Sequence, residues 1–423
     1  MSAVRQEGGP RRSLAGAPSQ GAKLIWDLLL LERVRPSFWA DWAIQLKGGL
    51  QRESQEKGDE ERLQTCSDLE HIELPERSPW VVDPVISKMF SRRYEPRHQT
   101  YFKNMAAWAH YSLRPVSERR ARALWAWSAA VIFVTDLIDG WDLPTMGLVA
   151  DLPNLPDLLE ARTLGVDALV AGVPELGTLL DSRRALMMAI ERDNEVFRLP
   201  QCEASPQLWD AVRIVRRASN LCFGLRPTET WWEDYRREMG HFVHSRLAEL
   251  ILRRCGVKGN ANPEADLECC LRSRAMDLGC PAATIVTGLS QGDHPTWSSG
   301  ITRALAEVQA LSWLHRIAVT DLYSYYWQRG EGRGNLLQTV MTLAPKGTPP
   351  TLGQGVDCVV RFGNRLWEEF KRQAHQLETS PEGRRSPGLR GHLRELGNTM
   401  MGNLDFTRRE GTLFQDPAKL DTL

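Results

Sequence analysis

The most constraining feature of this chain is the segment RARALWAWSAAVIFVTDLID, residues 120–139, which contains no glycine or proline before Gly140. Ser117 in front of it is suited to cap a helix, and Gly140 is suited to end one, so we predict a helix over 117–140. Apolar residues surround this helix almost completely, so it must be central and buried. The rest of the chain must therefore supply enough structure to enclose it.

The remaining pattern predicts an all-α protein. Strand signals, meaning alternating runs of β-branched residues bounded by turns, are almost absent. Apolar residues instead recur at helical spacing along most of the chain. We therefore expect one large bundle of about ten or more helices. The other predicted helices are 23–46, 181–198, 206–220, 228–254, 263–278, 282–289, 299–329, 334–343, 352–377 and 386–402.

Several segments interrupt this pattern. Residues 1–22 are rich in Gly, Pro, Ser and Arg and are predicted to be a disordered tail, which leaves 23–423 as one domain. The charged segment 47–64 is expected to be flexible. Residues 72–98 carry four prolines and are expected to form an extended strap over the helices. Residues 141–200, with prolines and glycines between short Leu-rich pieces, are expected to be an irregular insertion.

Composition excludes several classes of protein. Lys plus Arg and Asp plus Glu both total 53, so the net charge is zero, which argues against a nucleic-acid-binding protein. The 8 cysteines form no C-x-x-C pair, so neither a zinc site nor a disulfide scaffold is expected. No uninterrupted apolar run of about 18 residues predicts a membrane span, and no signal peptide is recognisable. We therefore expect a soluble, cytoplasmic protein.

The first polar cluster lies at the end of the apolar helix, in FVTDLIDGWD. Thr135, Asp136 and Asp139 are three and four residues apart, so they share one helix face. Carboxylates on so apolar a helix are costly unless they are paired, exposed at a cavity mouth or bound to a cation. The alternative interpretation is two acids that simply reach solvent near Gly140.

The second polar cluster lies in AVTDLYSYYWQRGEGRGN. Thr320, Ser324 and Gln328 recur every four residues and place three side-chain oxygens in one line, with Asp321 beside it. Hydroxyl and amide oxygens can complete a Mg²⁺ shell together with water and phosphate oxygens. Alternatively, this is the polar face of a helix that meets solvent.

Between the two clusters lies Arg274, in LRSRAMDLGCPA, followed by Asp277 and a helix break at Leu278–Gly279. Arginine is the natural partner of a phosphate because its planar guanidinium donates two parallel hydrogen bonds. A single arginine on a helix is more often a surface charge. Its significance here depends on the two clusters around it.

These residues together resemble class I terpene synthases, the metal-dependent cyclases of prenyl diphosphates. That family folds as an α-helical bundle around a deep apolar cavity. TDLID resembles its acidic D-D-x-x-D motif, and TDLYSYYWQ resembles its N-D-x-x-S-x-x-x-E motif. Arg274 precedes Thr320 by 46 residues, which fits the usual spacing of the diphosphate-sensing arginine. The run NLLQTVM resembles the family's Asn-Leu-Val run. The resemblance covers roughly residues 70–410.

The resemblance implies roles for particular residues. Up to three Mg²⁺ ions would be held by residues of the two motifs, namely Asp136, Asp139, Thr320, Ser324 and Gln328. Arg274 would bind the diphosphate, Asp277 would be the linker, and Gly279 would be the effector at the helix break. These three, with the two aspartates of the first motif, form the implied catalytic set. The substrate would be a small-molecule prenyl diphosphate, and we expect a monomer or a homodimer.

The chain also departs from the family pattern. Thr135 stands at the first Asp of the acidic motif, unless Asp136 is taken as that first position. In the second motif Thr320 replaces Asn and Gln328 replaces Glu; Glu331 is a possible substitute carboxylate. Near the C-terminus Phe406 replaces a Trp, and Thr412–Leu413 replaces the diphosphate-contacting Arg-Tyr pair. Arg408 or Arg409 could supply that arginine.

With its long insertion, its Pro-rich strap and its divergent motifs, the chain looks most like a fungal sesquiterpene cyclase, in particular like the atypical fungal humulene synthases. The implied reaction is ionisation of farnesyl diphosphate, 1,11-closure and loss of one proton to give α-humulene. The 15 tryptophans suggest an aromatic wall that would stabilise the cation. Core packing remains the alternative for each ring. The candidates are Trp125, Phe133, Trp313 and Phe102, followed by Trp232 and Trp327.

Two other functions remain compatible with the sequence. A catalytically inactive relative could bind a prenyl diphosphate without reacting, which would account for Thr135 and Gln328. A prenyltransferase could join an allylic diphosphate to another acceptor. Such an enzyme would normally carry two Asp-rich motifs, whereas the second cluster contains only Asp321.

Overall fold

The computed structural model describes most of the helical part of the chain. The described residues are 34–35, 37–55, 64–72, 82–93, 108–113, 117–139, 185–190, 206–225, 227–254, 263–291, 297–325, 328, 334–342 and 350–410. Across these ranges the regular structure is helical and contains no strand, so the prediction of an all-α protein is confirmed. The predicted tail 1–22 and most of the predicted insertion 141–200 lie outside the described residues.

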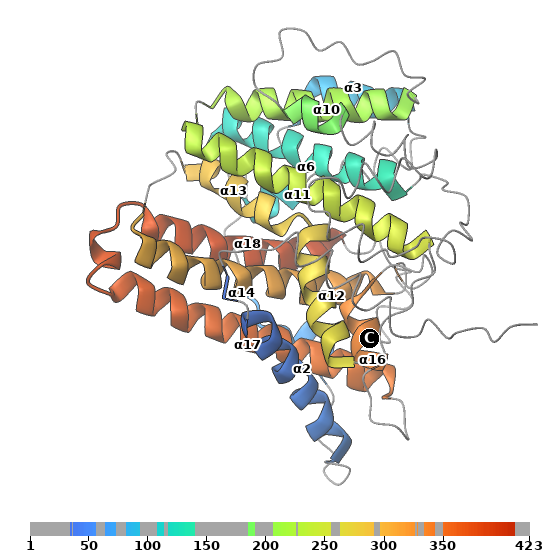
Figure 1. Ribbon diagram of the computed structural model, residues 1–423, viewed down its shortest axis with the longest axis vertical. Coiled ribbons are helices and arrows are strands. Elements are labelled where there is room, and N and C mark those ends of the chain that lie inside the picture. The colour runs from blue at the N-terminus through green and yellow to red at the C-terminus, as the bar shows by residue number, and fades with distance from the viewer. Residues whose placement is uncertain are drawn as a thin grey trace, which may run out of the picture.

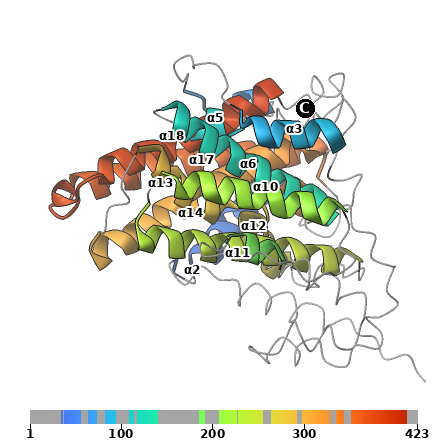
Figure 2. The same ribbon diagram turned by 90° about the horizontal axis from the view of Figure 1, so that it is seen from above.

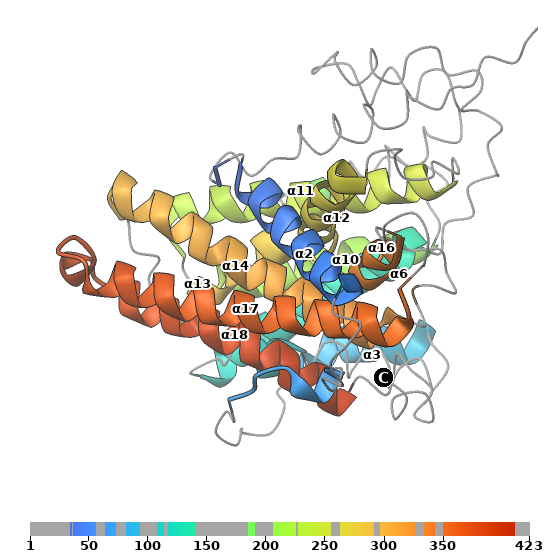
Figure 3. The same ribbon diagram turned by 90° about the horizontal axis from the view of Figure 1, so that it is seen from below.

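The helices form two groups, each with its own apolar core (Figure 1). The first core is built around α6, with side chains from α3, α5, α10, α11 and α13. The second is built around α14, with side chains from α2, α12, α16, α17 and α18. Figures 2 and 3 show the two groups from above and below. The elements are α2 (Ser37–Gln55), η1 (Cys66–Asp68), α3 (Pro84–Arg93), α5 (Trp108–Ser112), α6 (Glu118–Asp139), α10 (Pro206–Phe223), α11 (Glu229–Arg254), α12 (Pro263–Asp277), α13 (Cys280–Gln291), α14 (Ser299–Tyr323), α16 (Leu336–Thr342), α17 (Leu352–Thr379), η3 (Gly383–Arg385) and α18 (Leu389–Glu410).

Helix α6 is the central helix of the first group, as its sequence predicts. The Ser117 hydroxyl accepts a hydrogen bond from the Arg120 backbone N–H (3.4 Å), and the helix begins at Glu118. Small residues, Ala123 and Ala126 among them, are fully buried and let α10 approach closely. Residues Glu118–Ile138 are long and apolar enough to cross a membrane, but 72% of this stretch is buried inside the protein. Such burial is typical of a core helix.

Helix α14 is the central helix of the second group. It packs mainly against α17 and α18. Ser298 caps its N-terminus, because the Ser298 hydroxyl accepts a hydrogen bond from the Ile301 N–H (3.3 Å). The helix was predicted to continue to 329, but it ends at Tyr323, with Ser324 as its C-cap. The backbone hydrogen bond from Gln328 to the Ser324 carbonyl (2.9 Å) nevertheless continues the helical line past this distortion.

Two segments that were predicted to be irregular contain helices. The expected strap 72–98 includes α3, which begins at Pro84. Proline fits the first position of a helix, where no N–H donor is needed, and the Asp83 carboxylate accepts hydrogen bonds from Val85 N and Ile86 N (both 3.1 Å). The prediction of an extended strap is therefore wrong for 84–93. Helix α2 likewise extends to Gln55, into the segment expected to be flexible.

Candidate functional site

The two polar clusters found in the sequence lie at the C-terminal ends of α6 and α14. Both helices run from left to right in Figure 1, so these two ends face the same side of the molecule. The starts of the two helices are held by contacts of their own. Arg119 at the start of α6 binds the carbonyl of Gly224 beyond α10, and Ser298 at the start of α14 binds Glu382 in the turn before α18.

The α14 cluster is mostly buried. The Ser324 hydroxyl donates a hydrogen bond to the Thr320 carbonyl (2.6 Å), which leaves its lone pairs free to accept or to ligate. Ser324 and Gln328 are 3% and 4% exposed, so both oxygens face the protein interior rather than bulk solvent. The Gln328 Oε1 accepts a hydrogen bond from Asn335 Nδ2 (2.7 Å). The side-chain oxygens of Ser324 and Gln328 are thus held by internal hydrogen bonds, and the predicted line of three oxygen ligands stays a prediction.

The α6 cluster is different. Asp136 is exposed, and Thr135 is half-buried one residue earlier. Asp139 is the last residue of α6, and its side chain lies outside the described part of the structure. Leu137 and Ile138 are buried in the first core. The acidic face therefore emerges where the helix leaves the core.

Arg274 lies at the centre of a buried ionic network near the end of α12. Its guanidinium pairs with the carboxylates of Asp277 and Asp321, with Arg274 Nε 3.1 Å from Asp321 Oδ2. Arg246 of α11 pairs with the other oxygen of Asp277. The Asp321 carboxylate also accepts a hydrogen bond from the Leu336 backbone N–H (2.6 Å). Asp321 is fully buried. A buried carboxylate is costly without partners, and these donors stabilise it.

The network joins the two apolar cores. Arg246 is on α11 of the first group, while Arg274 and Asp321 are on α12 and α14 of the second. Asn335 extends it, because the Asn335 Nδ2 donates to the backbone carbonyl of Asp321 (2.8 Å) as well as to Gln328. Arg274 is thus connected, through Asp321 and Asn335, to Gln328 at the end of the α14 cluster.

The predicted helix break at Leu278–Gly279 is confirmed. Helix α12 ends at Asp277 and α13 begins at Cys280. Gly279 has a φ of 61°, a left-handed conformation that favours glycine. The turn places Asp277 next to the first residues of α13. Asp277 is in turn paired with Arg246 and Arg274.

Arg408 lies near the end of α14 but is engaged in structural contacts. Its Nη2 donates hydrogen bonds to the carbonyls of Ser67 and Leu69 (both 3.1 Å), and its guanidinium also hydrogen-bonds Tyr323. Burial raises the pKa of the Tyr323 hydroxyl, and Arg408 opposes that shift. Arg408 therefore ties α18 to the 66–69 segment and to α14. A role in binding a diphosphate stays a prediction.

The aromatic candidates are buried among other side chains. Trp125 is 0% exposed and packs against Phe90 (ring centroids 6.5 Å apart), which also stacks on Phe133 (5.9 Å). Trp313 donates from its indole N–H to the Thr284 hydroxyl (2.8 Å). Trp232 stacks on Tyr235 and lies tilted against Trp231 in another aromatic group. Phe102, Trp327 and Glu331 lie outside the described residues. A cavity-lining role for these rings stays a prediction.

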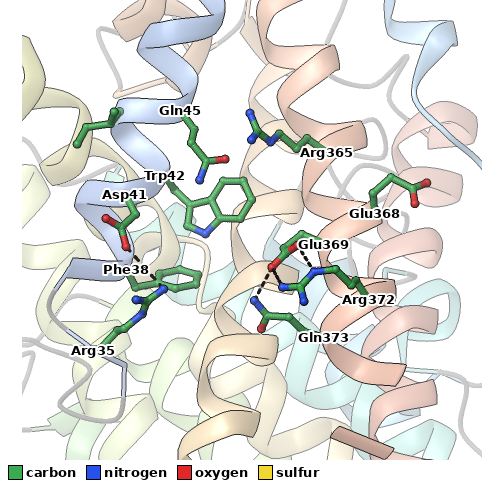
Figure 4. A pocket seen from close by; sticks show the side chains of 11 residues that line it. Arg35, Phe38, Asp41, Trp42, Gln45, Arg365, Glu368, Glu369, Arg372 and Gln373 are labelled. Carbon is green, nitrogen blue, oxygen red and sulfur yellow. Dashed lines mark hydrogen bonds and ion pairs between the residues drawn. The ribbon is translucent and has the colours of Figure 1, made fainter. Parts of the chain in front are cut away.

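A separate surface pocket of about 760 Å³ lies between α2 and α17 (Figure 4). Four of its charged residues form two pairs: Arg35 lies 3.6 Å from Asp41, and Arg372 pairs with Glu369. None of the residues predicted from the sequence to form the site lines this pocket. It is therefore not part of the candidate site.

Three parts of the network were not identified from the sequence. Arg246 occupies the apolar stripe of α11, seven residues after Met239 and four after Phe242, so its spacing could have indicated a buried charge. Asp321 was seen only as lying beside the oxygen line, and Asn335 was not singled out. Among the residues the structure describes, no three His, Cys, Asp or Glu side chains cluster to form a ready-made metal site.

No family model matches the sequence, and no curated protein matches it either. Solved structures do match the fold. The chain is similar to linalool/nerolidol synthase from Streptomyces clavuligerus in complex with 2-fluorogeranyl diphosphate, with a TM-score of 0.53 and 15% identity over 75% of this chain and 93% of that one. It is also similar to an α-eudesmol synthase (TM-score 0.51, 13% identity, 80% of this chain and 98% of that one). A third match is aristolochene synthase from Penicillium roqueforti (TM-score 0.50, 12% identity, 79% and 98%).

These likenesses extend over most of both chains at very low sequence identity. They establish that the chain has the all-α fold of class I terpene synthases, bacterial and fungal members included. The fold expected from the two motifs is thus confirmed, whereas the roles of individual site residues are not tested by it.

Proposed function

We propose that this protein is a class I terpene cyclase that ionises farnesyl diphosphate and cyclises the resulting cation. The observation that carries the proposal is the buried network of Arg274, Asp277 and Asp321 at the α12–α13 break, in a chain with the terpene synthase fold. A guanidinium held in a fixed position within a dry site binds phosphate oxygens strongly. The match to a structure holding 2-fluorogeranyl diphosphate supports a prenyl diphosphate as the ligand class.

The donor atoms of the two motifs suit a hard divalent cation such as Mg²⁺. They are carboxylate, hydroxyl and amide oxygens, and the Ser324 oxygen keeps free lone pairs while it donates to Thr320. Mg²⁺ is usually held by one or two carboxylates together with substrate phosphates and water, so a cluster of three acids is not required. Residues that would hold it are Asp136, Asp139, Thr320, Ser324 and Gln328. When bound, Mg²⁺ would neutralise charge on the departing diphosphate.

The chain's own residues would do the rest. Arg274 would orient the diphosphate and stabilise the negative charge that grows as the C–O bond breaks. An apolar, aromatic surrounding would exclude water from the allylic cation and stabilise it by roughly 0.5–2 kcal/mol per ring. We propose α-humulene, formed by 1,11-closure and loss of a proton, as the product.

The test is direct. The purified protein is incubated with Mg²⁺ and the geranyl, farnesyl or geranylgeranyl diphosphate, and extracts are examined by gas chromatography while released diphosphate is measured. A sesquiterpene from farnesyl diphosphate is expected. Diphosphate release only in the presence of an added acceptor would indicate a prenyltransferase instead. Binding without release of diphosphate would indicate an inactive relative.

Variants at the end of α6 test the placement of the metal site. Asp136→Ala or Asp139→Ala is expected to abolish turnover while the helical circular-dichroism signal is retained. Glu118→Gln at the opposite, exposed end of α6 is the matched control and should be active. Activity that survives both aspartate changes would contradict the proposed site.

A further inference from the structure

Arg316 is an unusual residue within the buried part of α14. It lies three residues after Trp313 and four before Thr320, so all three share one helix face. Arg316 and Thr320 are half-buried, whereas the residues between them are buried. The face of α14 that carries the predicted oxygen ligand therefore also carries a guanidinium one turn earlier.

The guanidinium of Arg316 has unused hydrogen-bonding capacity. Its Nε and Nη1 atoms are buried and have no hydrogen-bond partner. The group lies over the ring of Trp108, with Cζ 4.3 Å from the ring centroid, and it contacts the Cys280 thiol. Within the described ranges, no carboxylate forms an ion pair with it. Buried N–H groups are normally satisfied, so two unused ones on a charged group indicate a missing acceptor.

The described carboxylates near Arg316 are engaged by other arginines. Arg246 and Arg274 already take the carboxylates of Asp277 and Asp321. Among the described ion pairs, Asp277 and Asp321 are thus engaged by Arg246 and Arg274, and neither pairs with Arg316. Burial lowers the pKa of the Arg316 guanidinium, and the charge of Arg274 adds to that effect. The free protein bears this cost, which an anionic ligand would relieve.

The position of Cys280 strengthens the case for an anion. Cys280 is the first residue of the 12-residue helix α13, so its contact with Arg316 places the guanidinium near the N-terminal, positive end of that helix. Burial raises the pKa of the Cys280 thiol, which keeps it neutral and unable to balance the charge. Arg316, Arg274 and the start of α13 therefore all favour negative charge at one place.

We propose that Arg316 is a second diphosphate-binding arginine, which works beside Arg274 and donates to phosphate oxygens of the ligand. This inference rests on the proposed function for the identity of the substrate, a prenyl diphosphate. The anion-binding role itself can be measured with inorganic diphosphate, which carries the same phosphate chemistry without the hydrocarbon chain.

The experiment is calorimetric titration of the full-length protein with inorganic diphosphate in the presence of Mg²⁺. Arg316→Met removes the charge and every N–H but keeps an unbranched side chain that can pack on Trp108. Arg303→Gln, at an exposed position of the same helix, is the matched control. Affinity is expected to fall about 10-fold or more in Arg316→Met, since a charge-assisted hydrogen bond is lost, and to be unchanged in Arg303→Gln. Arg316→Lys should retain part of the affinity.

Thermal melting of the free variants separates binding from a structural role. Removal of an unsatisfied buried cation should leave the melting temperature of Arg316→Met unchanged or raised. If Arg316→Met melts lower than the wild type and binds diphosphate equally well, Arg316 is structural and the proposal is overturned. Should Arg316→Met fail to fold, Arg316→Lys decides: weaker binding by several-fold supports the proposal, and wild-type affinity contradicts it.

Turnover distinguishes failure of this inference from failure of the proposed function. Arg316-dependent binding of diphosphate by a protein that forms no terpene would refute the cyclase and support the anion site. Equal kcat/KM for farnesyl diphosphate in the wild type and Arg316→Met would support the cyclase and refute a role for Arg316. Absence of diphosphate binding by the wild type would overturn the inference outright.

Discussion

The ends of α6 and α14 carry comparable polar clusters but are built in opposite ways. At the α14 end, Asp321 is fully buried and accepts hydrogen bonds from Arg274 and from the Leu336 backbone. At the α6 end, Asp136 is exposed, and the helix leaves the core within a few residues. One cluster is organised by the folded chain itself, while the other presents its acid to solvent.

Under the proposed function, this difference would assign diphosphate binding to the α14 end and cation binding to the α6 end. Groups that must hold a leaving diphosphate benefit from being positioned in advance, because no reorganisation is then needed during the reaction. An exposed carboxylate costs little to maintain, because water solvates its charge, and it remains accessible to an arriving cation. We therefore expect changes at the α14 end to affect folding strongly, and changes at the α6 end to affect mainly ligand binding.

The largest expected effect is on stability at the α14 end. Asp321→Ala leaves Arg274 with one carboxylate fewer and the Leu336 N–H without an acceptor. Breaking a buried ion pair typically costs about 3–5 kcal/mol. Asp136→Ala, the matched change on exposed α6 surface, should alter the free energy of unfolding by less than about 0.5 kcal/mol. Urea denaturation of both variants measures the contrast, and equal values would show that the two ends do not differ.

Some of the helix boundaries could be predicted from the sequence. The bounds of α6 and the break at Leu278–Gly279 follow from local signals, namely a capping serine, a long apolar run and glycines. Helix α3 does not follow from the same signals, because the prolines nearby indicate extended chain, whereas Pro84 occupies the first position of the helix, where proline is favoured.

The candidate site was predictable only in part. The spacing of Arg274 and Asp277 is local, and they do pair. The pairs Arg246–Asp277 and Arg274–Asp321 join different helices, and nothing in local spacing specifies which charges meet across a core. Tertiary packing decides that, so the oxygen line on α14 was visible in the sequence while the buried network behind it was not.

The next effect concerns pH and again belongs to α14. His315 is 1% exposed, and burial lowers its pKa from 6.5 to about 4. Above pH 6.5 the His315 ring is neutral in both the folded and the unfolded chain, so protonation of His315 does not reduce stability there. As the pH falls from 6.5 toward 4, only the unfolded chain gains the proton, so stability falls by up to about 3 kcal/mol.

His315→Phe should remove this part of the acid sensitivity. Urea denaturation at pH 7.5, 6 and 5 gives the difference between wild type and variant at each pH. His375→Gln, at an exposed position of α17, serves as the control and should follow the wild-type pH dependence. Parallel pH profiles for the wild type and His315→Phe would show that His315 does not carry the effect.

A smaller effect is expected at the turn that positions Asp277. Gly279→Ala places a side chain at a φ of 61°, which costs about 1–2 kcal/mol. The added Cβ would lie 3.4 Å from Phe242, an ordinary contact, so the cost is one of backbone conformation. Gly48→Ala, inside α2 with open space around the new Cβ, should instead stabilise the protein by about 0.5–1 kcal/mol. The melting temperature should fall in Gly279→Ala and rise in Gly48→Ala. Shifts in the same direction would show that backbone conformation does not decide the effect.

The smallest effect concerns the α6 end, where Thr135→Asp would restore an acid at the first position of the motif. A third carboxylate in the last turn of α6 is disfavoured by its acidic neighbours and by the negative end of the helix, at a cost of about 0.5 kcal/mol. A bound cation would reverse that effect, because the added carboxylate would then be a ligand or a close counter-charge. We therefore expect Thr135→Asp to melt slightly below the wild type without ligands and slightly above it with Mg²⁺ and diphosphate. Thr302→Asp, exposed in the first turn of α14, should not respond to Mg²⁺. If Thr135→Asp is equally insensitive, the end of α6 is a solvated acidic surface and not half of a metal site.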